Sequence, residues 1–428
     1  MSIEWLIGLL LLLAVLGMPL FAVILGIALV GLHAAGYGQA ALTEFYALGD
    51  MPGLLAIPLF TLAGYLLSES GAPKRLVRLS NAFIGGLPGG LAIVTIVVCA
   101  LFTAFTGASG VTIVAVGALL YPALRQAGYP DLYALGLVTT CGSLGLLFAP
   151  SMPLILYGFM AGQVGSTPPV GVQEMFQAGL LPGLVLMAVL ALHAMWVGRH
   201  LPRPERGFDA AEAWAAIKDA RWELPLPLLV LLAIYQGVLA VSEVSALTAA
   251  WVLLVTVIIR REISWGRLPA VMSEAMRMVG AILLILGAAK ALSNWFIDRD
   301  VPTALFTWVS LHVETQTEFL VVLNVFLLGV GMLVDIFSAI VILTPLLLPL
   351  AQHYGVHPAH LGVVMLTNLE IGYMTPPVGM NLFVAAYRFQ VPILTILRAT
   401  LPFLLLLGIA LVIITRWPWL STVFLATG

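Results

Sequence analysis

Residues 102–113 (FTAFTGASGVTI) form a small, hydroxyl-rich stretch inside an otherwise apolar region. This composition disfavours a regular helix, and backbone groups freed in an apolar environment need protein, water or ions as partners. We therefore predict a re-entrant hairpin with its tip at residues 106–110. The hydroxyls of Thr106 and Ser109, with nearby carbonyl oxygens, are hard ligands that suit Na⁺ better than transition metals. A close contact between two helices through small residues explains this motif equally well.

Residues 331–340 (GMLVDIFSAI) occupy the matching place in the second half of the chain. They contain Asp335 and, three residues later, the hydroxyl of Ser338. An ionised carboxylate within an apolar span is costly unless it is paired. We therefore predict that Asp335 lies at a second hairpin tip, where it binds Na⁺ or carries a proton. A buried ion pair with Lys290 is the alternative.

Residues 367–381 (TNLEIGYMTPPVGMN) contain two adjacent prolines that begin at Pro376. Two successive prolines cannot continue a regular helix, so we expect the span to break near Thr375. A broken span presents carbonyl oxygens from one half-helix, which suit a cation. The positive N-terminal end of the next half-helix suits an anion. Gly379 permits a close backbone approach, and Asn381 offers both donors and acceptors. A proline kink needed only for packing is the alternative.

The counterpart of this segment in the first half is residues 139–153 (TTCGSLGLLFAPSMP). By the same reasoning, Ser151, Pro376 and Asn381 are our candidates for contacting a substrate. Glu370 could be a functional acid, and an ion pair with Arg388 or Lys290 explains it equally well.

Enzymatic motifs are not recognisable in the sequence. The histidines have no HExxH-type spacing, and no GxxxxGK[ST] loop is present that could bind ATP phosphates. No Ser/His/Asp set stands out. We therefore expect no enzymatic activity, no ATP hydrolysis and no organic cofactor.

The composition indicates a helical protein of the membrane. Of the 428 residues, 61% are hydrophobic and only 9% charged, against about 25% charged residues in soluble domains. A formal net charge of −2 leaves no basic face for nucleic acid. Long uninterrupted apolar runs predict helical spans rather than the short alternating segments of a membrane barrel. The chain has room for roughly a dozen spans or partial spans.

The charged residues predict the orientation of the chain. Residues 198–224 form the only stretch typical of a real extramembrane loop, with a short helix expected around residues 210–220. A basic cluster follows at residues 260–267, after two apolar runs that could form a hairpin of two spans. The positive-inside bias then places both clusters, and Lys74, Arg75 and Arg78, in the cytoplasm. At the N-terminus, residues 5–32 are expected to form a single retained span.

The two halves of the chain resemble each other. Pro122 and Pro349 are 227 residues apart, as are Gly128 and Gly355, and Pro150 and Pro376 are 226 apart. In each half we expect the same order of elements. A turn that is marked either by Gly and Ser or by Asp comes first, and a helix that ends at a proline, a short loop and a span broken by proline follow. Paired interruptions at matching positions are typical of transporters whose site lies where inverted repeats meet.

These segments resemble the large membrane subunit, the DctM type, of tripartite ATP-independent periplasmic (TRAP) transporters. The similarity extends over about residues 5–415. It rests on the strings IPLFTLAG (57–64), FTGAS (105–109), LTPLLLP (343–349), NLEIG (368–372) and TPPVGMNLF (375–383). The family usually has Ser-Gly-Ser-Ser at the first tip, where this chain has TGAS, so Thr106 replaces one hydroxyl ligand.

The resemblance implies an all-α polytopic membrane protein, an inverted-repeat elevator-type transporter with two re-entrant hairpins and broken helices. It implies a Na⁺-driven symporter subunit of the bacterial inner membrane that works with a small four-span membrane subunit and a soluble periplasmic substrate-binding protein. Its cation sites fall near Ser109 and Gly142 in one half and near Asp335, Thr375 and Gly379 in the other. With the hydroxyls above, the predicted Na⁺ ligands are as follows: Thr106, Gly107, Ser109, Gly142, Asp335, Ser338, Thr375 and Gly379.

The resulting division of the chain separates scaffold from transport elements. Residues 1–90 are expected to form N-terminal scaffold spans and residues 91–196 the first transport repeat. Residues 197–276 comprise the cytoplasmic loop and a scaffold hairpin, and residues 277–316 the scaffold spans of the second repeat. Residues 317–392 form the second transport repeat, and residues 393–428 the C-terminal span.

Sodium-coupled symport of a small organic acid is the function that these features predict. A single-component divalent-anion/sodium symporter, which needs no soluble partner, is the first alternative. A membrane-embedded enzyme is the second, and the lack of a recognisable catalytic constellation argues against it. The substrate itself is left open by the sequence.

Overall fold

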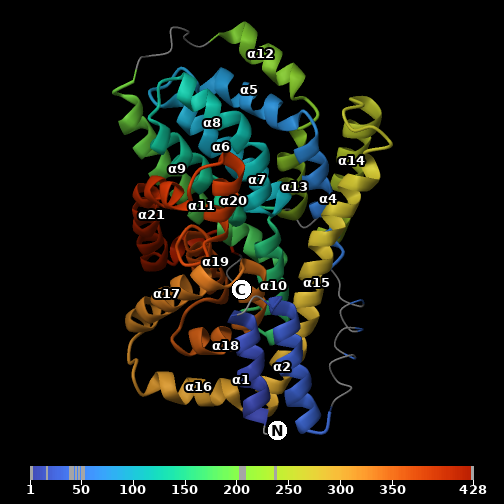
Figure 1. The fold of residues 1–428 in the computed structure, drawn as a ribbon, viewed down its shortest axis with the longest axis vertical. Helices are drawn as coiled ribbons and strands as arrows, with labels where there is room; N and C mark the ends of the chain where they lie inside the picture. Colours follow the sequence, from blue (N-terminus) through green and yellow to red (C-terminus); the bar gives the residue numbers. More distant parts are fainter. Residues whose placement is uncertain are drawn as a thin grey trace.

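The computed structural model describes residues 3–15, 18–37, 54–201, 209–235 and 239–425, with the isolated residues Thr43, Tyr46 and Gly49. The elements in these ranges are all helical, and they form one elongated bundle (Figure 1). Seven helical segments in the described part are long and apolar enough to cross a membrane. The predicted all-α polytopic fold is confirmed.

The N-terminal region differs from the single span expected over residues 5–32. It contains two shorter helices, α1 (Ile3–Val15) and α2 (Leu20–Ala34), which pack against each other. Pro19 lies directly before α2 in an extended conformation and cannot donate a backbone hydrogen bond. The prediction of one continuous span was wrong because it gave the long apolar run more weight than this proline.

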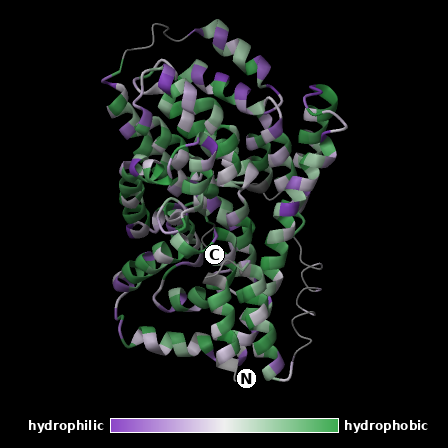
Figure 2. Cartoon of the chain, viewed as in Figure 1, coloured by the Kyte–Doolittle hydropathy of each residue, from purple (hydrophilic) through white to green (hydrophobic). Residues whose placement is uncertain are grey.

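Charged residues gather at one end of the bundle, the upper end in Figures 1 and 2. This end contains α5 (Ala72–Ile84) and the expected short helix, α12 (Ala210–Asp219). The expected hairpin follows as α13 (Pro225–Tyr235) and α14 (Val241–Leu253), which continues as a π-helix, η2 (Leu254–Ile259). The charged residues 202–208 of the central loop lie outside the described residues.

Ion pairs join the basic clusters at this end. The Arg75 guanidinium donates to Glu223 at 2.8 Å and also pairs with Glu262. The side chains of Arg75 and Glu223 are largely buried, and Glu262 is partly exposed. On the exposed side of the same helix, Arg78 pairs with Glu212 at 2.8 Å. The clusters predicted to share one side of the membrane therefore lie together.

The helix boundaries follow the predicted repeat. Thr106 and Leu333 end α6 and α17, and they are 227 residues apart. The same interval separates the first residues of the helices that follow each interruption, Ser109 from Ile336, and of the next helices, Asp131 from Pro358. The repeats contain the following helices. The first repeat has α4 (Ala56–Glu69), α5, α6 (Gly90–Thr106), α7 (Ser109–Ala115), α8 (Gly117–Gln126), α9 (Asp131–Cys141), η1 (Leu144–Leu147), α10 (Met152–Val164) and α11 (Val172–Gly198). The second repeat has α15 (Leu268–Asp298), α16 (Val301–Ser310), α17 (Gln316–Leu333), α18 (Ile336–His353), α19 (Pro358–Gly372), α20 (Met380–Phe389) and α21 (Ile393–Arg416). The short helix α22 (Trp419–Thr422) follows the second repeat.

The two repeats are arranged in opposite directions. Helix α5 lies across the upper end of the bundle and its counterpart α16 across the lower end, while α15 runs along the length between them (Figure 1). Helix α7, which follows the first interruption, packs against α20, which follows the broken helix of the second repeat (Figure 1). This arrangement brings the interrupted segments of the two repeats together.

Candidate cation and substrate site

The first interruption is a sharp turn between two helices. Helix α6 ends at Thr106, and Gly107 follows with φ +65°, a left-handed conformation that favours glycine. The amide of Gly107 donates to the carbonyl of Thr103 at 2.8 Å, and Ala108 is extended before α7 begins. The predicted break at residues 106–110 is therefore present. Thr106 is fully buried, and its hydroxyl lies 3.4 Å from the carbonyl oxygen of Ala108.

This first tip fits closely against an early helix of the same repeat. A Cβ atom on Gly64 of α4 would lie only 2.4 Å from the carbonyl oxygen of Phe105. Only glycine therefore allows α4 to approach the backbone of the tip this closely. The side chain of Met152 packs directly against Gly107.

A hydroxyl pair links the first tip to the broken helix of its own repeat. The Thr103 hydroxyl donates to the carbonyl of Gly142 at 2.8 Å and lies 2.7 Å from the hydroxyl of Thr112. Both threonines are fully buried. Helix α9 ends at Cys141, directly before Gly142, so this carbonyl belongs to the free end of a helix. Oxygen atoms from both sides of the turn thus converge at this point.

The first tip also contacts the second repeat. The Ser109 hydroxyl donates to Oδ1 of Asn381 at 2.7 Å, across 272 residues of sequence. Asn381 is fully buried, and its Nδ2 has no hydrogen-bond partner among the described residues. A buried amide without a partner is costly, so this nitrogen is a candidate for donating to a ligand. The two interrupted segments therefore meet, as the sequence predicted.

The second interruption contains Asp335. Helix α17 ends at Leu333, and Asp335 is extended and caps α18. Its Oδ1 accepts from the amides of Phe337 and Ser338, at 3.0 Å each, and its Oδ2 accepts from the Ser338 hydroxyl. The carboxylate is therefore held by the N-terminus of its own helix, where a negative charge is favoured.

Two contacts join this second tip to the broken helix of the same repeat. The Tyr373 hydroxyl accepts from the amide of Ile336 at 2.7 Å, and the amide of Val378 donates to the carbonyl of Met332 at 3.1 Å. Close by, a Cβ atom on Gly372 would lie 2.5 Å from the backbone of Gly331. The second tip and the second break therefore form one unit.

The second broken helix has the predicted form. Helix α19 ends at Gly372 and α20 begins at Met380, with the prolines between them. Gly379 has φ +40°, and a Cβ there would lie 2.9 Å from the carbonyl oxygen of Thr375. The Thr375 hydroxyl donates to the carbonyl of Ile371 at 2.9 Å, and Pro376 is exposed.

The break between α9 and α10 in the first repeat is more buried than the break between α19 and α20 in the second. Ser151 precedes α10, is fully buried and donates its hydroxyl to the carbonyl of Leu146. Among the three candidate substrate contacts, Asn381 lies at the junction of the repeats, because it accepts a hydrogen bond from Ser109 of the first repeat. Pro376 faces outward, and the hydroxyl of Ser151 is already used within its own repeat.

Glu370 is buried without an ion pair. The side chain is 1% exposed, and neither carboxylate oxygen has a hydrogen-bond partner in the described part of the chain. The suggested partner Arg388 instead donates to the carbonyl of Val114 at 3.1 Å. The proposed Glu370–Arg388 pair was therefore wrong. Ser143 of the first repeat, 227 residues earlier, lies beside the carboxyl group.

Several residues of this site were not singled out from the sequence. Thr103 and Tyr373 lie within the quoted motifs, but nothing in their spacing reveals that they bond across each turn. Gly64 is part of the IPLFTLAG string, whose close approach to the tip is visible only in three dimensions. No group of three or more His, Cys, Asp or Glu side chains that could bind a metal occurs in the described ranges. The available ligands are therefore mainly backbone and hydroxyl oxygens.

Comparison with known proteins identifies the family. Residues 3–420 match the model of the tripartite ATP-independent periplasmic transporter, DctM component. The chain belongs to this family. It is also 32% identical over 377 residues to the C4-dicarboxylate TRAP transporter large permease protein DctM of Rhodobacter capsulatus, with 86% of each chain covered. The recognition made from the sequence motifs is thereby confirmed, as is a multi-pass protein of the inner membrane.

Two further matches concern chain organisation and fold. The isethionate TRAP transporter permease protein DctMQ of Oleidesulfovibrio alaskensis is 32% identical over 408 residues, which cover 91% of this chain and 63% of that protein. The Alcanivorax borkumensis YdaH transporter has a solved structure with a TM-score of 0.62 and 15% identity, covering 89% of this chain and 87% of that one. At this identity, the likeness concerns the fold alone.

Proposed function

We propose that this chain performs sodium-coupled symport of a small organic acid, together with a small membrane subunit and a soluble periplasmic binding protein. The observation that carries the proposal is the 2.7 Å hydrogen bond between Ser109 and Asn381. It joins the first hairpin tip to the second broken helix, and transporters with such paired interruptions bind substrate and ions where their repeats meet.

The first cation site would use oxygen atoms of Thr106, Gly107, Ser109 and Gly142. The Thr106 hydroxyl is buried, and its 3.4 Å contact is too long for a good O–H···O hydrogen bond, so its oxygen remains available. The carbonyl of Gly142 accepts one hydrogen bond from Thr103 and has a second lone pair free. Hydroxyl and carbonyl oxygens of this kind suit a hard monovalent cation.

The second cation site would use Asp335, Ser338, Thr375 and Gly379. Asp335 contributes the only carboxylate of the set and is already oriented by its helix. The bend at Gly379 keeps the carbonyl of Thr375 close to the start of α20. A cation bound here would neutralise Asp335 and join the second tip to the second break.

The substrate would bind where the tips and the broken helices meet. The N-terminus of α20 provides the positive end of a helix for an anionic group. Asn381, the second residue of that helix, has a buried Nδ2 that could donate to a carboxylate oxygen. Ser151 and Pro376 stay predicted contacts at the rims of the two breaks.

Coupling follows from the cost of charge in a lipid environment. The hairpins and broken helices would move as a transport domain against the scaffold helices, in an elevator motion. A domain loaded with only part of its ions and substrate would carry uncompensated charge through the bilayer. Movement would therefore be favoured only for the fully loaded or the empty domain.

The substrate class rests on the relatives. The R. capsulatus relative is named for C4-dicarboxylates and the O. alaskensis relative for isethionate. We propose a small organic acid of this kind. The O. alaskensis protein, whose name joins M and Q, also suggests that the large subunit works directly beside a small membrane subunit.

The experiment that tests the proposal removes the charge of Asp335. We expect Asp335→Asn to abolish Na⁺-dependent uptake in liposomes that contain the complete transporter, with the protein still folded. Glu314→Gln, which neutralises an exposed carboxylate near the start of α17, is the matched control and should transport normally. Unchanged Na⁺ dependence in Asp335→Asn would reject the assignment.

The requirement for a soluble partner separates the proposal from the single-component alternative. Uptake should depend on added binding protein in otherwise identical liposomes. Uptake by this chain alone would favour the single-component symporter. A chemical change of the solute during counterflow would instead indicate an enzyme.

A further inference from the structure

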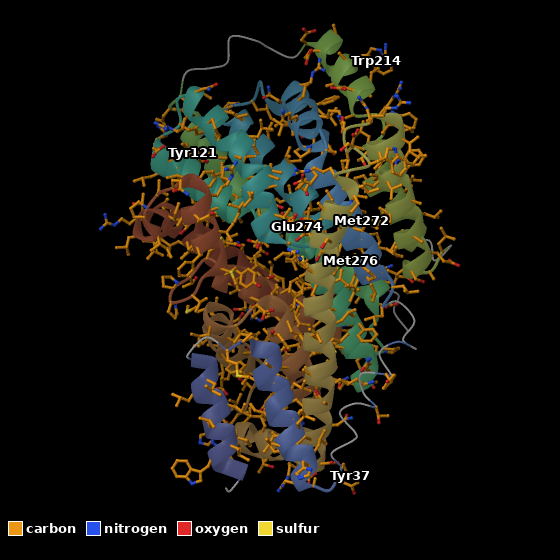
Figure 3. The ribbon with its side chains drawn as sticks, turned by 45° about the vertical axis from the view of Figure 1, so that its right-hand side comes forward. Tyr37, Tyr121, Trp214, Met272, Glu274 and Met276 are labelled. Carbon is orange, nitrogen blue, oxygen red and sulfur yellow. The ribbon has the colours of Figure 1, made fainter. Side chains whose placement is uncertain are left out.

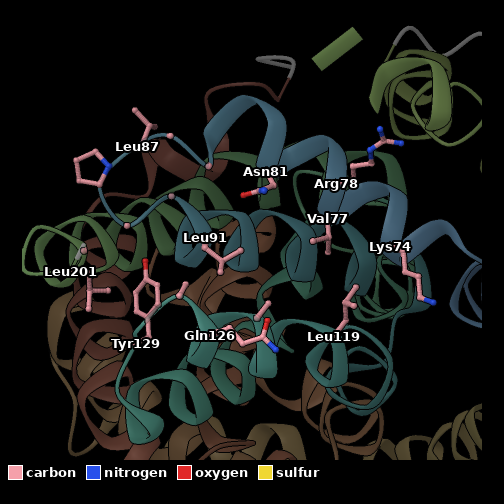
Figure 4. Close-up of a pocket in the computed structure, with 18 residues that line it drawn as sticks. Lys74, Val77, Arg78, Asn81, Leu87, Leu91, Leu119, Gln126, Tyr129 and Leu201 are labelled. Atoms are coloured by element: carbon pink, nitrogen blue, oxygen red, sulfur yellow. The ribbon is translucent and has the colours of Figure 1, made fainter. Parts of the chain in front are cut away.

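A cavity of about 880 Å³ opens at the charged end of the molecule (Figure 4). It lies between α5, the glycine-rich loop of residues 85–90, α8 and the end of α11. Its lining includes no residue of either hairpin tip or either break. It is therefore separate from the proposed substrate site.

The charged groups of this cavity are all basic. Lys74 and Arg78 line it, and no aspartate or glutamate does. Arg78 points away from the middle of the cavity (Figure 4) and pairs with Glu212 at 2.8 Å, so its charge is largely balanced. Lys74 is exposed, and within the described ranges it forms no ion pair. The net preference of the cavity is therefore for an anion, centred on Lys74.

Apolar side chains form a large part of the same cavity. Val77, Leu91, Leu119 and Ala123 line it beside the amides of Asn81 and Gln126. A small, fully hydrated anion would gain nothing from this apolar surface. An amphipathic anion would place its charged group near Lys74 and the amides and its hydrocarbon along the apolar wall.

The counterpart cavity at the other end is different. It has a volume of about 460 Å³ and lies between α10, α15, the start of α16 and α18. Its lining contains Asp300 as well as Lys290. An anionic ligand would therefore meet a repelling negative charge in this smaller cavity, but not in the larger one. The anionic preference belongs to one end of the molecule only.

We propose that the cavity between α5 and α8 binds an anionic diacyl phospholipid. The phosphodiester would lie near Lys74, the rest of the headgroup would extend along the cavity toward the amides of Asn81 and Gln126, and an acyl chain would follow Val77, Leu91 and Leu119. Basic pockets between helices at the membrane surface bind anionic headgroups in this way. A lipid here would fill the gap between a helix that lies across the end of the molecule and the helices that cross its interior (Figure 1).

Photocrosslinking tests the proposal on the full chain. The protein is placed in phosphatidylcholine nanodiscs that contain a trace of phosphatidylglycerol with a photoreactive acyl chain. We expect crosslinks in the peptides that contain residues 77–91 and 119–129. Lys74→Gln should lower their yield about fivefold, as expected for one basic contact at a membrane surface, while Lys74→Arg keeps it. Ala123→Phe, which narrows the apolar wall, should lower the yield as well.

Two controls make the outcome decisive. Lys218→Gln removes an equally exposed lysine from α12 at the same end, outside the cavity, and should leave the yield unchanged. Unlabelled phosphatidylglycerol should compete, and soluble glycerol phosphate should not. Competition by glycerol phosphate at equal concentration would identify a soluble-anion cavity and overturn the proposal. Equal yields in the original protein, Lys74→Gln and Ala123→Phe would also overturn it.

Discussion

Asn381 is a fully buried amide whose two polar atoms are in different situations. Its oxygen accepts from Ser109, while its nitrogen has no partner within the described residues. The Ser109 hydroxyl occupies the amide oxygen, which leaves the nitrogen on the other side of the amide group for a further partner. The free donor is thus directed by a residue of the other repeat, and a ligand held there would sense both halves of the protein.

At the residue scale, we predict that Ser109 and Asn381 act as a pair. Ser109→Ala and Asn381→Ala should each raise the half-saturating Na⁺ concentration for uptake about fivefold, because each removes a hydrogen bond of about 1 kcal/mol. The double variant should lose less than the sum of the two single losses, since the shared contact is lost only once. Sodium titrations of uptake in liposomes measure this.

Ser310→Ala is the control for this pair, since it removes an exposed serine hydroxyl at the end of α16. It should leave the titration unchanged. Additive effects of Ser109→Ala and Asn381→Ala would mean that the two side chains act independently, against the coupling that their contact implies.

The broken elements interlock the two repeats. Helix α7 of the first repeat packs against α20 of the second, and α18 of the second packs against α10 of the first. In contrast, the first helix of each hairpin packs against its own repeat, α6 on α9 and η1 and α17 on α19. Each tip therefore lies directly before a helix that contacts the other repeat as well as its own.

At the element scale, we predict that the contact between α17 and α19 does not tolerate a methyl group. Gly372→Ala should destabilise the protein by about 1–3 kcal/mol, because its Cβ would overlap the backbone of Gly331, and overpacking has costs of this size. Gly329→Ala, on α17 with no atom within 4 Å of its Cβ, should be neutral or slightly stabilising. Thermal unfolding in detergent compares the two variants, and equal melting temperatures would contradict the close contact.

The ion cluster of Arg75 joins α5 to the start of α13 and the loop after η2. The pKa of the Glu262 carboxyl is lowered: partial burial raises it, but the hydrogen bonds from Arg75 and the amide of Gly71, with the nearby positive charges, outweigh that effect. A carboxyl whose pKa is lower in the folded state stabilises the protein at pH values above the pKa that the group has in the unfolded state. That contribution is lost as the pH falls through the folded value.

We therefore predict that the cluster stabilises the protein at neutral pH and less in acid. Arg75→Gln should cost about 3 kcal/mol at pH 7, because it leaves the largely buried carboxylate of Glu223 without its charged partner. The difference in free energy of unfolding between Arg75→Gln and the original protein should shrink as the pH falls below 4.5, the ordinary pKa of the Glu262 carboxyl. Arg78→Gln, on the exposed side of the same helix, should cost under about 1 kcal/mol. A pH-independent difference for Arg75→Gln would reject this account.

The sequence predicted local interruptions better than contacts between them. Proline pairs, glycine and helix-breaking hydroxyl residues act on their own backbone, so the breaks near Thr106, Asp335 and Thr375 were predictable. The 227-residue interval also carried over into the helix boundaries. The bond from Ser109 to Asn381 joins residues 272 positions apart, and a single sequence has no periodic signal for such a contact. The same holds for the packing of Gly64 on the first tip.

At the scale of the whole molecule, charge is distributed unevenly between two ends. Trp214 on α12 marks the upper end in Figure 3 and Tyr37, after α2, the lower end. Ion pairs between arginines and carboxylates connect α5, α12 and the loop after η2 at the upper end. The lower end contains α16, and Asp298, Arg299 and Asp300 lie directly before the start of this helix. From the positive-inside rule, we predict that the upper end faces the cytoplasm.

This orientation predicts opposite labelling of two exposed positions. Lys218→Cys on α12 should react with a membrane-impermeant maleimide only after cells are permeabilised, and Ser310→Cys on α16 should react in intact spheroplasts. The native thiols give little background because Cys99 and Cys141 are both buried and free. Labelling of Lys218→Cys from outside, with protection of Ser310→Cys, would reverse the orientation. It would place the lysine-centred lipid cavity in the periplasmic leaflet, and the end that contains α16 would then face the cytoplasm.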